Sequence, residues 1–501
     1  MLHLSKSRYC QAVQCPKILW MQRHMPEAFD DSAVNQAVLD RGNAVGDLAM
    51  GLLGDCVEVP FGELSGMIQR TQELIDGGTP VIAEASFAFE GLFCAVDILK
   101  VLGRGRVEFV EVKSSTHVTD IYIHDVAYQY YVLTKLGYTV ERVRIAHIDS
   151  GYVRHGELEL DQLFTMEDLT EQARALQPEV ERRVAELAAY MQQEGEPECA
   201  IGGQCFYPYA CGFFGYCGRD LPKPNIFDVG GIQLRTKLAN LAKGIVSFQD
   251  IELKKALKPD KLMQIRHELH DLPPAIDREK IARFLDGLSY PLYFLDFESI
   301  QPAVPLYDNS SPYEQIVFQY SLHFIEEEGG ALQHREYLAR PGADPRRGVA
   351  EQLCRDIPRD ACTLAYNMSF EKTRIRGLAA LYPDLADHLM NIHDNIVDLM
   401  VPFQKRWYYT KAMQGSYSIK FVLPALFPGD PQLDYHNLED VHNGTEASAA
   451  FEKMAEMAPE ERERCRANLL KYCGLDTLAM VKVWEKLREA ARGNAAGGEE
   501  G

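Results

Sequence analysis

The sequence lacks any run of apolar residues that approaches the roughly 18 needed for a membrane-spanning helix. Its first nine residues, Met1 to Tyr9, contain no apolar stretch of signal-peptide length. These two absences predict a cytoplasmic protein with no membrane association.

Basic residues are also scarce, because 52 Lys and Arg face 73 Asp and Glu, which gives a formal net charge of −21 and a pI near 5.2. Non-specific coating of nucleic acid or of an anionic membrane needs a broad basic surface, so this balance argues against it. This balance is compatible with a local basic groove. Carboxylates that cluster at metal sites contribute to such an excess of acidic residues. There is no internal repeat and no low-complexity segment.

The length of 501 residues exceeds what one hydrophobic core supports, whereas the hydrophobic share of 46% and the charged share of 25% are ordinary for a folded protein. We therefore expect an α/β protein of two domains with a connecting piece. The expected parts are a first domain at 1–220, a helical connector at 221–289, a second domain at 290–492 and a disordered tail at 493–501.

The spacing of apolar residues predicts the elements of both domains. In the first domain we expect strands at 80–84, 92–99, 107–112 and 142–148, with helices at 36–53, 119–136 and 169–193. In the connector, Leu238–Ile245 resembles half of a phosphate-gripping helix–hairpin–helix, although a plain helical spacer is the favoured explanation. In the second domain we expect strands at 292–297, 316–323, 335–339 and 363–366, and helices at 369–381, 419–426, 445–457 and 460–492.

Two carboxylates and a lysine are placed to meet in the first domain. Asp97 ends one predicted strand, and Glu111 and Lys113 share one face of the next. Carboxylate oxygens suit Mg²⁺ or Mn²⁺, which acidifies a bound water, while Lys113 orients that water or stabilises developing negative charge. Gln129, on the following helix, is spaced to reach the phosphate or the lysine. Alternating charges on a surface strand produce such a short motif by chance as well.

Twelve cysteines are present, and four of them, Cys199, Cys205, Cys211 and Cys217, recur every six residues. Because disulfides are rare in the cytosol, metal ligation is the leading explanation for this set. Thiolates suit Zn²⁺ or an iron–sulfur cluster. A zinc site that uses Cys199 and a set of unligated buried thiols are the alternatives.

These features resemble the RecB-type branch of the PD-(D/E)xK nucleases over roughly residues 1–220. The resemblance implies a restriction-endonuclease-like fold in which Asp97 and Glu111 bind the metal and Lys113 is the catalytic lysine. In iron–sulfur members one cysteine precedes the nuclease core and three follow it, which implies that Cys15 joins three later cysteines around a [4Fe–4S] cluster. The matching set here is Cys15, Cys205, Cys211 and Cys217. Many relatives carry a metal-binding His on the first helix, where this chain has Gly46.

A second group of carboxylates lies in the last part of the chain. Asp296 and Glu298 share one face of an apolar strand, and two buried carboxylates side by side are costly unless a cation lies between them. Far downstream, Tyr472 and Asp476 share a helix face at i, i+4. Glu371 lies at the start of a helix that follows a strand.

This second group resembles the tyrosine-bearing DEDD 3′–5′ exonucleases of the DnaQ type, over roughly residues 290–490. The resemblance implies an RNase H-like domain in which Asp296, Glu298 and Asp476 hold metal ions and Tyr472 orients the attacking water. Glu371 stands where that family usually has Asp. The whole chain, including the stretch 318–323, resembles a bacterial family of largely unknown function that pairs a RecB-like nuclease with a DnaQ-like domain.

From these residues we expect a metal-dependent nuclease that hydrolyses phosphodiester bonds, with Mg²⁺ or Mn²⁺ and an iron–sulfur cluster as cofactors. The resemblances imply an exonuclease that acts on DNA rather than RNA, in repair, recombination or defence, with a helicase or other repair protein as partner. The competing hypothesis is a nucleic-acid-binding or assembly protein with degenerate nuclease sites, which Gly46 and Glu371 favour.

Overall fold

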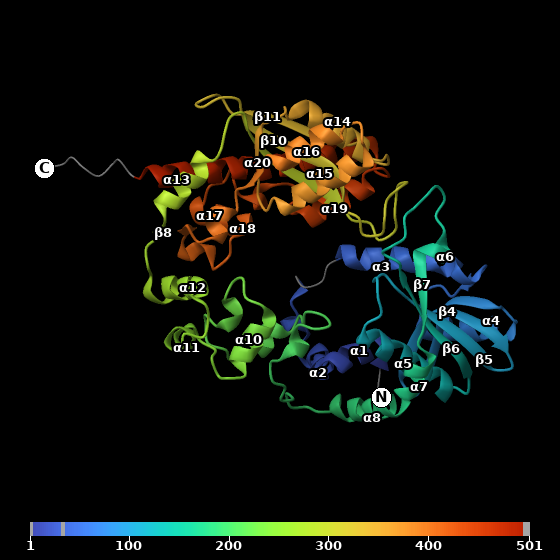
Figure 1. Ribbon diagram of the computed structural model, residues 1–501. Coiled ribbons are helices and arrows are strands. Elements are labelled where there is room, and N and C mark those ends of the chain that lie inside the picture. Colours follow the sequence, from blue (N-terminus) through green and yellow to red (C-terminus); the bar gives the residue numbers. More distant parts are fainter. Residues whose placement is uncertain (1–3, 32–35, 494–501) are drawn as a thin grey trace. The chain divides into compact units, whose positions relative to one another are not determined.

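The computed structural model describes residues 4–31 and 36–493 and shows a mixed α/β protein that divides into two compact units (Figure 1). Unit 1 consists of Met1–Asp220 with Pro302–Glu314, and unit 2 of Leu221–Gln301 with Gln315–Gly501. The expected connector at 221–289 therefore belongs to unit 2. Of the expected tail, only Gly493 is among the described residues. In the described part of the chain, no helix has the length and apolar character needed to cross a bilayer.

Unit 1 is built on a seven-stranded sheet in the order β2-β3-β4-β5-β6-β7, with the short β1 paired to β4. Its central strands β3, β4 and β5 are antiparallel neighbours, and β5 and β6 are parallel because helix α5 connects them. The strands are β1 Leu4–Ser5, β2 Val57–Glu58, β3 Val81–Phe89, β4 Leu92–Gly103, β5 Arg106–Lys113, β6 Thr139–Ile148 and β7 Phe164–Asp168.

Helices cover the sheet of unit 1 with two separate cores. One core contains residues of β3, β4 and β5 and lies under the helices α1 Lys6–Gln14, α5 Asp120–Lys135 and α8 Gln177–Tyr190. The other core packs α3 Gln36–Ala49 against alternate residues of the same strands. The expected single helix at 169–193 is two helices, α7 Thr170–Ala175 and α8, because Pro178 lies in the first turn of α8 and starts a new helix.

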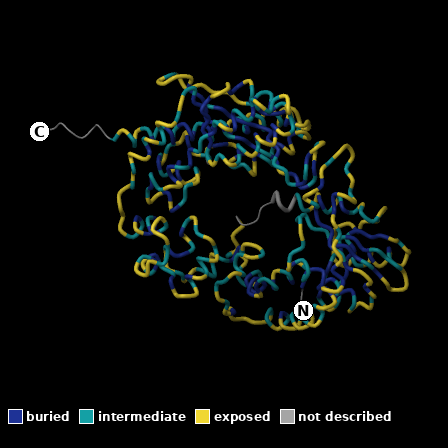
Figure 2. Tube along the Cα trace, viewed as in Figure 1, coloured by how far each residue is buried: buried dark blue, intermediate teal, exposed yellow. Residues whose placement is uncertain are grey.

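Unit 2 contains a five-stranded sheet in the order β11-β10-β9-β12-β13. Strand β10 is antiparallel to β9 and β11, whereas β12 is parallel to β9 and β13. Buried residues follow these strands, as they follow the sheet of unit 1 (Figure 2). The strands are β9 Leu292–Ile300, β10 Ile316–Ile325, β11 Gln333–Leu338, β12 Cys362–Ala365 and β13 Ile396–Asp398.

Alternation along β9 sends Tyr293, Leu295 and Phe297 into the main core of unit 2. That core lies under α14 Arg346–Asp356, α15 Ser369–Leu381 and α16 Ala386–Asp394. The intervening residues of β9 face the long helix α20 Pro459–Arg492, where Phe294 packs on Trp484 at 5.7 Å between ring centroids. The predicted carboxylates Asp296 and Glu298 thus lie on the α20 side of the sheet.

Between residues 221 and 289 the structure has the helices α10 Leu234–Leu241, α11 Phe248–Leu253, α12 Pro259–His270 and α13 Arg278–Asp286. Helices α11 and α12 pack around a small core of their own, whereas α13 packs against α20. A turn with Gly244 at φ +66° joins α10 to α11, so the Leu238–Ile245 motif spans the end of one helix and the turn to the next.

Two candidate metal centres and a cysteine cluster

The predicted ligands of unit 1 lie on adjacent strands. The register pairs Ile98 of β4 with Val110 of β5, which sets Asp97 beside Glu111. The backbone N–H of Val112 donates a hydrogen bond to Asp97 Oδ2 at 2.7 Å, and this contact fixes the carboxylate. Glu111 is only 2% exposed. The two carboxylates are therefore held rigidly at the middle of the sheet.

Lys113 and Gln129 both reach Glu111, whereas Gln129 was expected to reach the phosphate or the lysine. Lys113 Nζ donates to Glu111 Oε1 at 2.8 Å, and Gln129 Nε2 donates to Glu111 Oε2 at 2.7 Å. Both also donate to Asp125, at 2.7 and 3.0 Å. Asp125 was not predicted, although it lies four residues before Gln129 on α5 and so shares its face. Lys113 is thereby positioned by two carboxylates.

A second lysine, Lys6, also enters this centre and was not predicted. Its Nζ lies 3.1 Å from Asp97 Oδ1 and 2.9 and 3.0 Å from the two oxygens of Glu111. Burial opposes the charged form, but the carboxylates of Asp97, Glu111 and Asp125 outweigh it, so the pKa of Lys6 lies well above its ordinary value. Asp97 and Glu111 thus share one ammonium group.

The regular alternation of side chains between the two faces of the sheet is interrupted near Asp97. Val96 and Leu99 of β4 enter the same core although they are three residues apart, and Ile82 and Ala85 of β3 do the same. Glu84 lies between the latter two with φ +56°, a left-handed conformation that non-glycine residues adopt at a cost. This irregularity sets Glu84 next to the centre.

Glu84 is an additional acidic group of this centre that sequence reasoning missed. Burial, and then the charges of Asp97 and Glu111, raise its pKa to about 7. Gly46, at the position where the resemblance to RecB-type nucleases led us to look for a histidine, lies in α3, where an added Cβ would meet open space. Helix α3 therefore offers no ligand at that position, whereas β3 offers Glu84.

Five cysteines, not four, surround one cavity at the end of unit 1. The predicted Cys15, Cys205, Cys211 and Cys217 line it together with Cys199, which the zinc alternative uses. The sulfur atoms of Cys15 and Cys199 lie 3.6 Å apart. Lys17 and aromatic residues, including Phe213, complete the wall. Residues separated by almost 200 positions thus meet around one set of thiols.

The spacing of these sulfur atoms tests which metal group fits. A single Zn²⁺ with Zn–S bonds of about 2.3 Å needs four sulfurs within about 3.8 Å of one another. Among the described residues, no three of the five sulfurs lie within 4.8 Å of each other. The thiols are numerous and soft enough to bind a metal, and their sulfur atoms are spread more widely than the ligands of one zinc ion.

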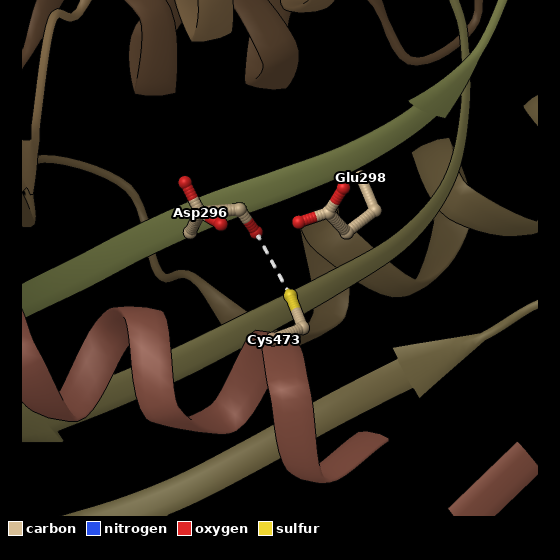
Figure 3. A group of neighbouring side chains, drawn as sticks. All are labelled: Asp296, Glu298 and Cys473. Atoms are coloured by element: carbon tan, nitrogen blue, oxygen red, sulfur yellow. Dashed lines mark hydrogen bonds between the residues drawn. The ribbon is translucent and has the colours of Figure 1, made fainter. Parts of the chain in front are cut away.

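The predicted ligands of unit 2 also meet. Asp296 and Glu298 project from β9, and Cys473 of α20 lies against them (Figure 3). Ligand atoms of these three residues lie within 4.8 Å of one another, close enough to hold one ion. The thiol of Cys473, whose sulfur lies 3.9 Å from the backbone oxygen of Asp296, was not predicted.

Asp476 and Tyr472, one turn apart on α20, complete this centre. Burial, then the charges of Asp476 and Glu298, raise the pKa of Asp296 well above its ordinary value, so the three carboxylates are close neighbours. Burial and Asp476 likewise raise the pKa of Glu298 to about 8. A second tyrosine, Tyr435, donates a hydrogen bond to Asp476 Oδ1 at 2.6 Å and was not predicted.

Glu371, at the first turn of α15, is 2% exposed. Its Oε2 is buried and has no hydrogen-bond partner among the described residues. Burial, and a smaller contribution from Asp398, raise its pKa to about 8, and its charge acts on Asp296. Glu371 thus lies near the predicted ligand Asp296, and its buried Oε2 is left without a hydrogen bond among the described residues.

A pocket of about 500 Å³ opens beside Tyr472 and Asp476. Its walls come from α18 Ile419–Leu426 and from the segment that leads to α19 Gly444–Lys453. They combine apolar residues such as Leu423 and Phe427 with the polar side chains of Lys420 and His442. This size and mixture are typical of a small-ligand site.

Comparison with known proteins finds relatives without an assigned activity. Residues 293–418 match the model of a family described as a domain of unknown function, DUF2779. An uncharacterized protein of Ureaplasma parvum serovar 3, UU173, is 26% identical over 217 residues, and the uncharacterized protein MG366 of Mycoplasma genitalium is 25% identical over 205. These matches cover 39% and 38% of this chain, and the chain covers 31% of the length of each relative. No solved structure matches the chain. The DUF2779 match includes Asp296, Glu298 and Glu371 and ends before Tyr472 and Asp476.

Proposed function

We propose that the chain is a metal-dependent nuclease with one phosphodiester-hydrolysing centre in each unit. The observation that carries this proposal is the convergence in unit 1 of Glu111, Lys113 and Gln129, from β5 and α5, at hydrogen-bond distances beside Asp97 of β4. A divalent ion bound there supplies a Lewis acid and an acidified water. Lys113, held by Glu111 and Asp125, orients that water or stabilises negative charge on the phosphate.

In unit 2, Asp296, Glu298 and Asp476 would offer oxygen ligands for divalent ions, and Tyr472, one turn before Asp476 on α20, would orient a water molecule. Burial raises the pKa of each of these three carboxyl groups, and the charge of Asp476 raises the pKa of Asp296 and of Glu298 further. A bound cation removes both penalties. The strand order of unit 2, with β10 antiparallel and β12 parallel to β9, supports the RNase H-like assignment, and the resemblances support DNA and single-stranded ends.

The cysteine cluster supports a structural iron–sulfur group in unit 1. Its spread of sulfur atoms favours a cluster over a single zinc ion. By joining Cys15 to residues near position 210, such a group ties the start of unit 1 to its end.

The second candidate function is a nucleic-acid-binding or assembly protein with degenerate centres. One observation favours it, because the ammonium group of Lys6 pairs with both Asp97 and Glu111. The two candidates differ in activity and in dependence on divalent ions.

Degradation of end-labelled single-stranded DNA and RNA by anaerobically purified protein, with Mg²⁺ or Mn²⁺, tests the proposal. Wild type is compared with Glu111→Gln, Asp296→Asn and the double variant, each close in shape to the residue it replaces. Glu181→Gln, an exposed carboxylate that pairs with Lys135, is the matched control. We expect each single variant to lose the activity of its own unit by at least about a hundredfold, with no cleavage by the double variant. Equal cutting by the double variant and wild type, or no cutting by wild type, contradicts the nuclease proposal.

A further inference from the structure

Lys6 is held in place by the backbone on both of its sides. Leu4 of β1 pairs with Leu92 of β4, and the carbonyl of Leu4 accepts a hydrogen bond from the buried Tyr128 hydroxyl. Ser5 caps α1 by accepting a hydrogen bond from the N–H of Arg8 at 3.3 Å. The backbone of Lys6, the first residue of that helix, is therefore fixed above the centre, and only its side chain is free to move.

The ammonium group of Lys6 uses the same oxygens that a divalent ion would use. Its three N–H donors are matched by Asp97 Oδ1 and by both oxygens of Glu111, at 2.9–3.1 Å. A Mg²⁺ ion would lie about 2.0–2.1 Å from such oxygens. The two cations cannot share this position, so an ion that binds Asp97 and Glu111 must displace the ammonium.

Charge decides how costly that displacement is. The ion-paired side chains of Asp97, Glu111 and Asp125 carry three negative charges against two positive charges on Lys6 and Lys113, which leaves one negative charge among these five groups. A divalent ion alone converts this to a net positive charge. A divalent ion together with one phosphodiester group leaves these five groups neutral, with Glu84 beside them as a further acid, and the phosphate oxygens give the displaced ammonium a new partner.

We propose that Lys6 is a positioning residue that makes metal binding and phosphodiester binding at the unit 1 centre depend on each other. This inference rests on the proposed nuclease function of unit 1. Without substrate, the ammonium occupies the carboxylates and weakens metal binding. With substrate, it moves to a phosphate oxygen beside the metal. The side chain of Lys6 is 21% exposed and has a flexible four-carbon stem, so a short swing suffices.

A purely structural role for Lys6 predicts a different outcome. If the ammonium only neutralises the two carboxylates, its removal lowers stability and leaves the link between metal and substrate unchanged. The coupling between the two ligands therefore separates the roles, because coupling is reciprocal and is measured from either ligand.

The test measures the Mn²⁺ dissociation constant of the full chain by electron paramagnetic resonance of free Mn²⁺. Asp296→Asn is present throughout, in order to weaken binding in unit 2. Lys6→Met is compared with Lys6 intact, and Lys135→Met, which removes an exposed lysine of α5, is the matched control. Each protein is titrated with and without a single-stranded phosphorothioate oligodeoxynucleotide, which resists cleavage. Lys6→Gln, which keeps a polar side chain, serves if Lys6→Met does not fold.

With Lys6 intact, we expect the oligonucleotide to tighten Mn²⁺ binding about fivefold or more. Without oligonucleotide, Lys6→Met should bind Mn²⁺ about tenfold more tightly than the protein with Lys6 intact, since no charged hydrogen-bond donor competes. The oligonucleotide should then increase the Mn²⁺ affinity of Lys6→Met by less than about twofold. Lys135→Met behaves like the protein with Lys6 intact. Equal affinities and equal coupling in all proteins overturn the role of Lys6, and if wild type still cuts DNA the nuclease proposal stands. If neither protein binds Mn²⁺ in unit 1, both proposals fail.

Discussion

At Glu84, β3 departs from strand geometry in the middle of the sheet. Its φ of +56° costs about 1–2 kcal/mol for a residue with a Cβ, and strain of this kind collects at functional sites, where the surrounding structure maintains it. The same residue carries a carboxyl group whose pKa is raised to about 7 beside Asp97. Backbone strain and an acidic side chain at one position indicate that Glu84 belongs to the candidate metal centre of unit 1.

We therefore expect Glu84→Gly to stabilise the metal-free protein relative to Glu84→Gln, by about 1 kcal/mol. Glycine adopts the left-handed conformation without strain, and this gain is reduced by the larger conformational entropy that glycine loses on folding. Glutamine removes the charge but keeps the backbone strain. Urea denaturation in EDTA measures the difference. Both variants should bind Mn²⁺ more weakly in unit 1, and a Glu84→Gly protein less stable than Glu84→Gln would contradict the prediction.

The residues of the unit 1 centre show what the sequence allowed us to predict. Glu111 and Lys113 are two positions apart on one strand, so a local motif places them on one face. Lys6 comes from a separate helix, and its place depends on the pairing of β1 with β4, which no local pattern indicates. The position of Glu84 depends on an interruption of the side-chain alternation in both β3 and β4, and only the structure reveals this interruption.

At the scale of elements, the apolar pattern predicted the strands that carry both centres, and the structure confirms them within a few residues. It missed α14, although Val349, Ala350 and Leu353 are buried at helical spacing. Charged residues surround these three and lowered the apolar density of the segment. Strand β13 was missed because it has only three residues, too few for a periodic pattern.

Helix α20 meets β10 and β11 through a buried polar network. His323 Nδ1 lies 2.8 Å from Thr477 Oγ1, which also hydrogen-bonds Ser321, and Ser321 hydrogen-bonds His334. The rings of His323 and His334 stack at 4.4 Å. Burial, and then the neighbouring His334, lower the pKa of His323 to about 4. Burial therefore favours the neutral form of His323.

This lowered pKa predicts acid sensitivity of unit 2. The unfolded chain takes up a proton at His323 near pH 6.5, whereas the folded protein does so only near pH 4. The stabilisation is complete above pH 6.5 and is lost as the pH falls toward 4, at a cost of roughly 2 kcal/mol. His323→Asn should flatten this part of the stability curve in urea titrations from pH 4 to 7, and His270→Asn, at an exposed histidine, should not. Parallel curves for wild type and His323→Asn would contradict the prediction.

At the scale of the whole molecule, one arrangement had no signal in the sequence. The segment Pro302–Glu314 joins β9 to β10 of unit 2 but packs in unit 1. There Ala303 enters the core beside Val45, and the N–H of Arg154 donates to the carbonyl of Ser310 at 3.0 Å. A division of the chain into consecutive domains does not anticipate an exchange of this kind, because composition and periodicity describe only neighbours in sequence.

The cysteine cluster acts at the same scale, since it links the beginning of unit 1 to its end. A group that binds the folded state alone adds its binding free energy to folding, and a link that closes a loop of about 200 residues contributes about 5 kcal/mol. For a unit of this size the loss corresponds to a fall in Tm of roughly 10–20 °C. We expect Cys15→Ser to lose bound iron and to lower the unfolding temperature of unit 1 by this amount. Elemental analysis and calorimetry of anaerobically purified protein measure both effects.

Two further serine variants make this test specific. Cys199→Ser should keep its iron if Cys15, Cys205, Cys211 and Cys217 are the ligands, while Cys354→Ser, at a half-buried cysteine of unit 2, should change neither property. The reverse pattern, with iron lost from Cys199→Ser and kept in Cys15→Ser, would exchange these two cysteines in the ligand set, because their sulfur atoms already lie 3.6 Å apart. Binding of zinc in place of iron would require the sulfur atoms to move to within about 3.8 Å of one another. Bound metal absent from all the proteins would leave thiols such as that of Cys15 as members of the apolar cluster that contains Ile18, Trp20, Met21 and Phe213, and unit 1 would then owe its stability to apolar packing without a metal link.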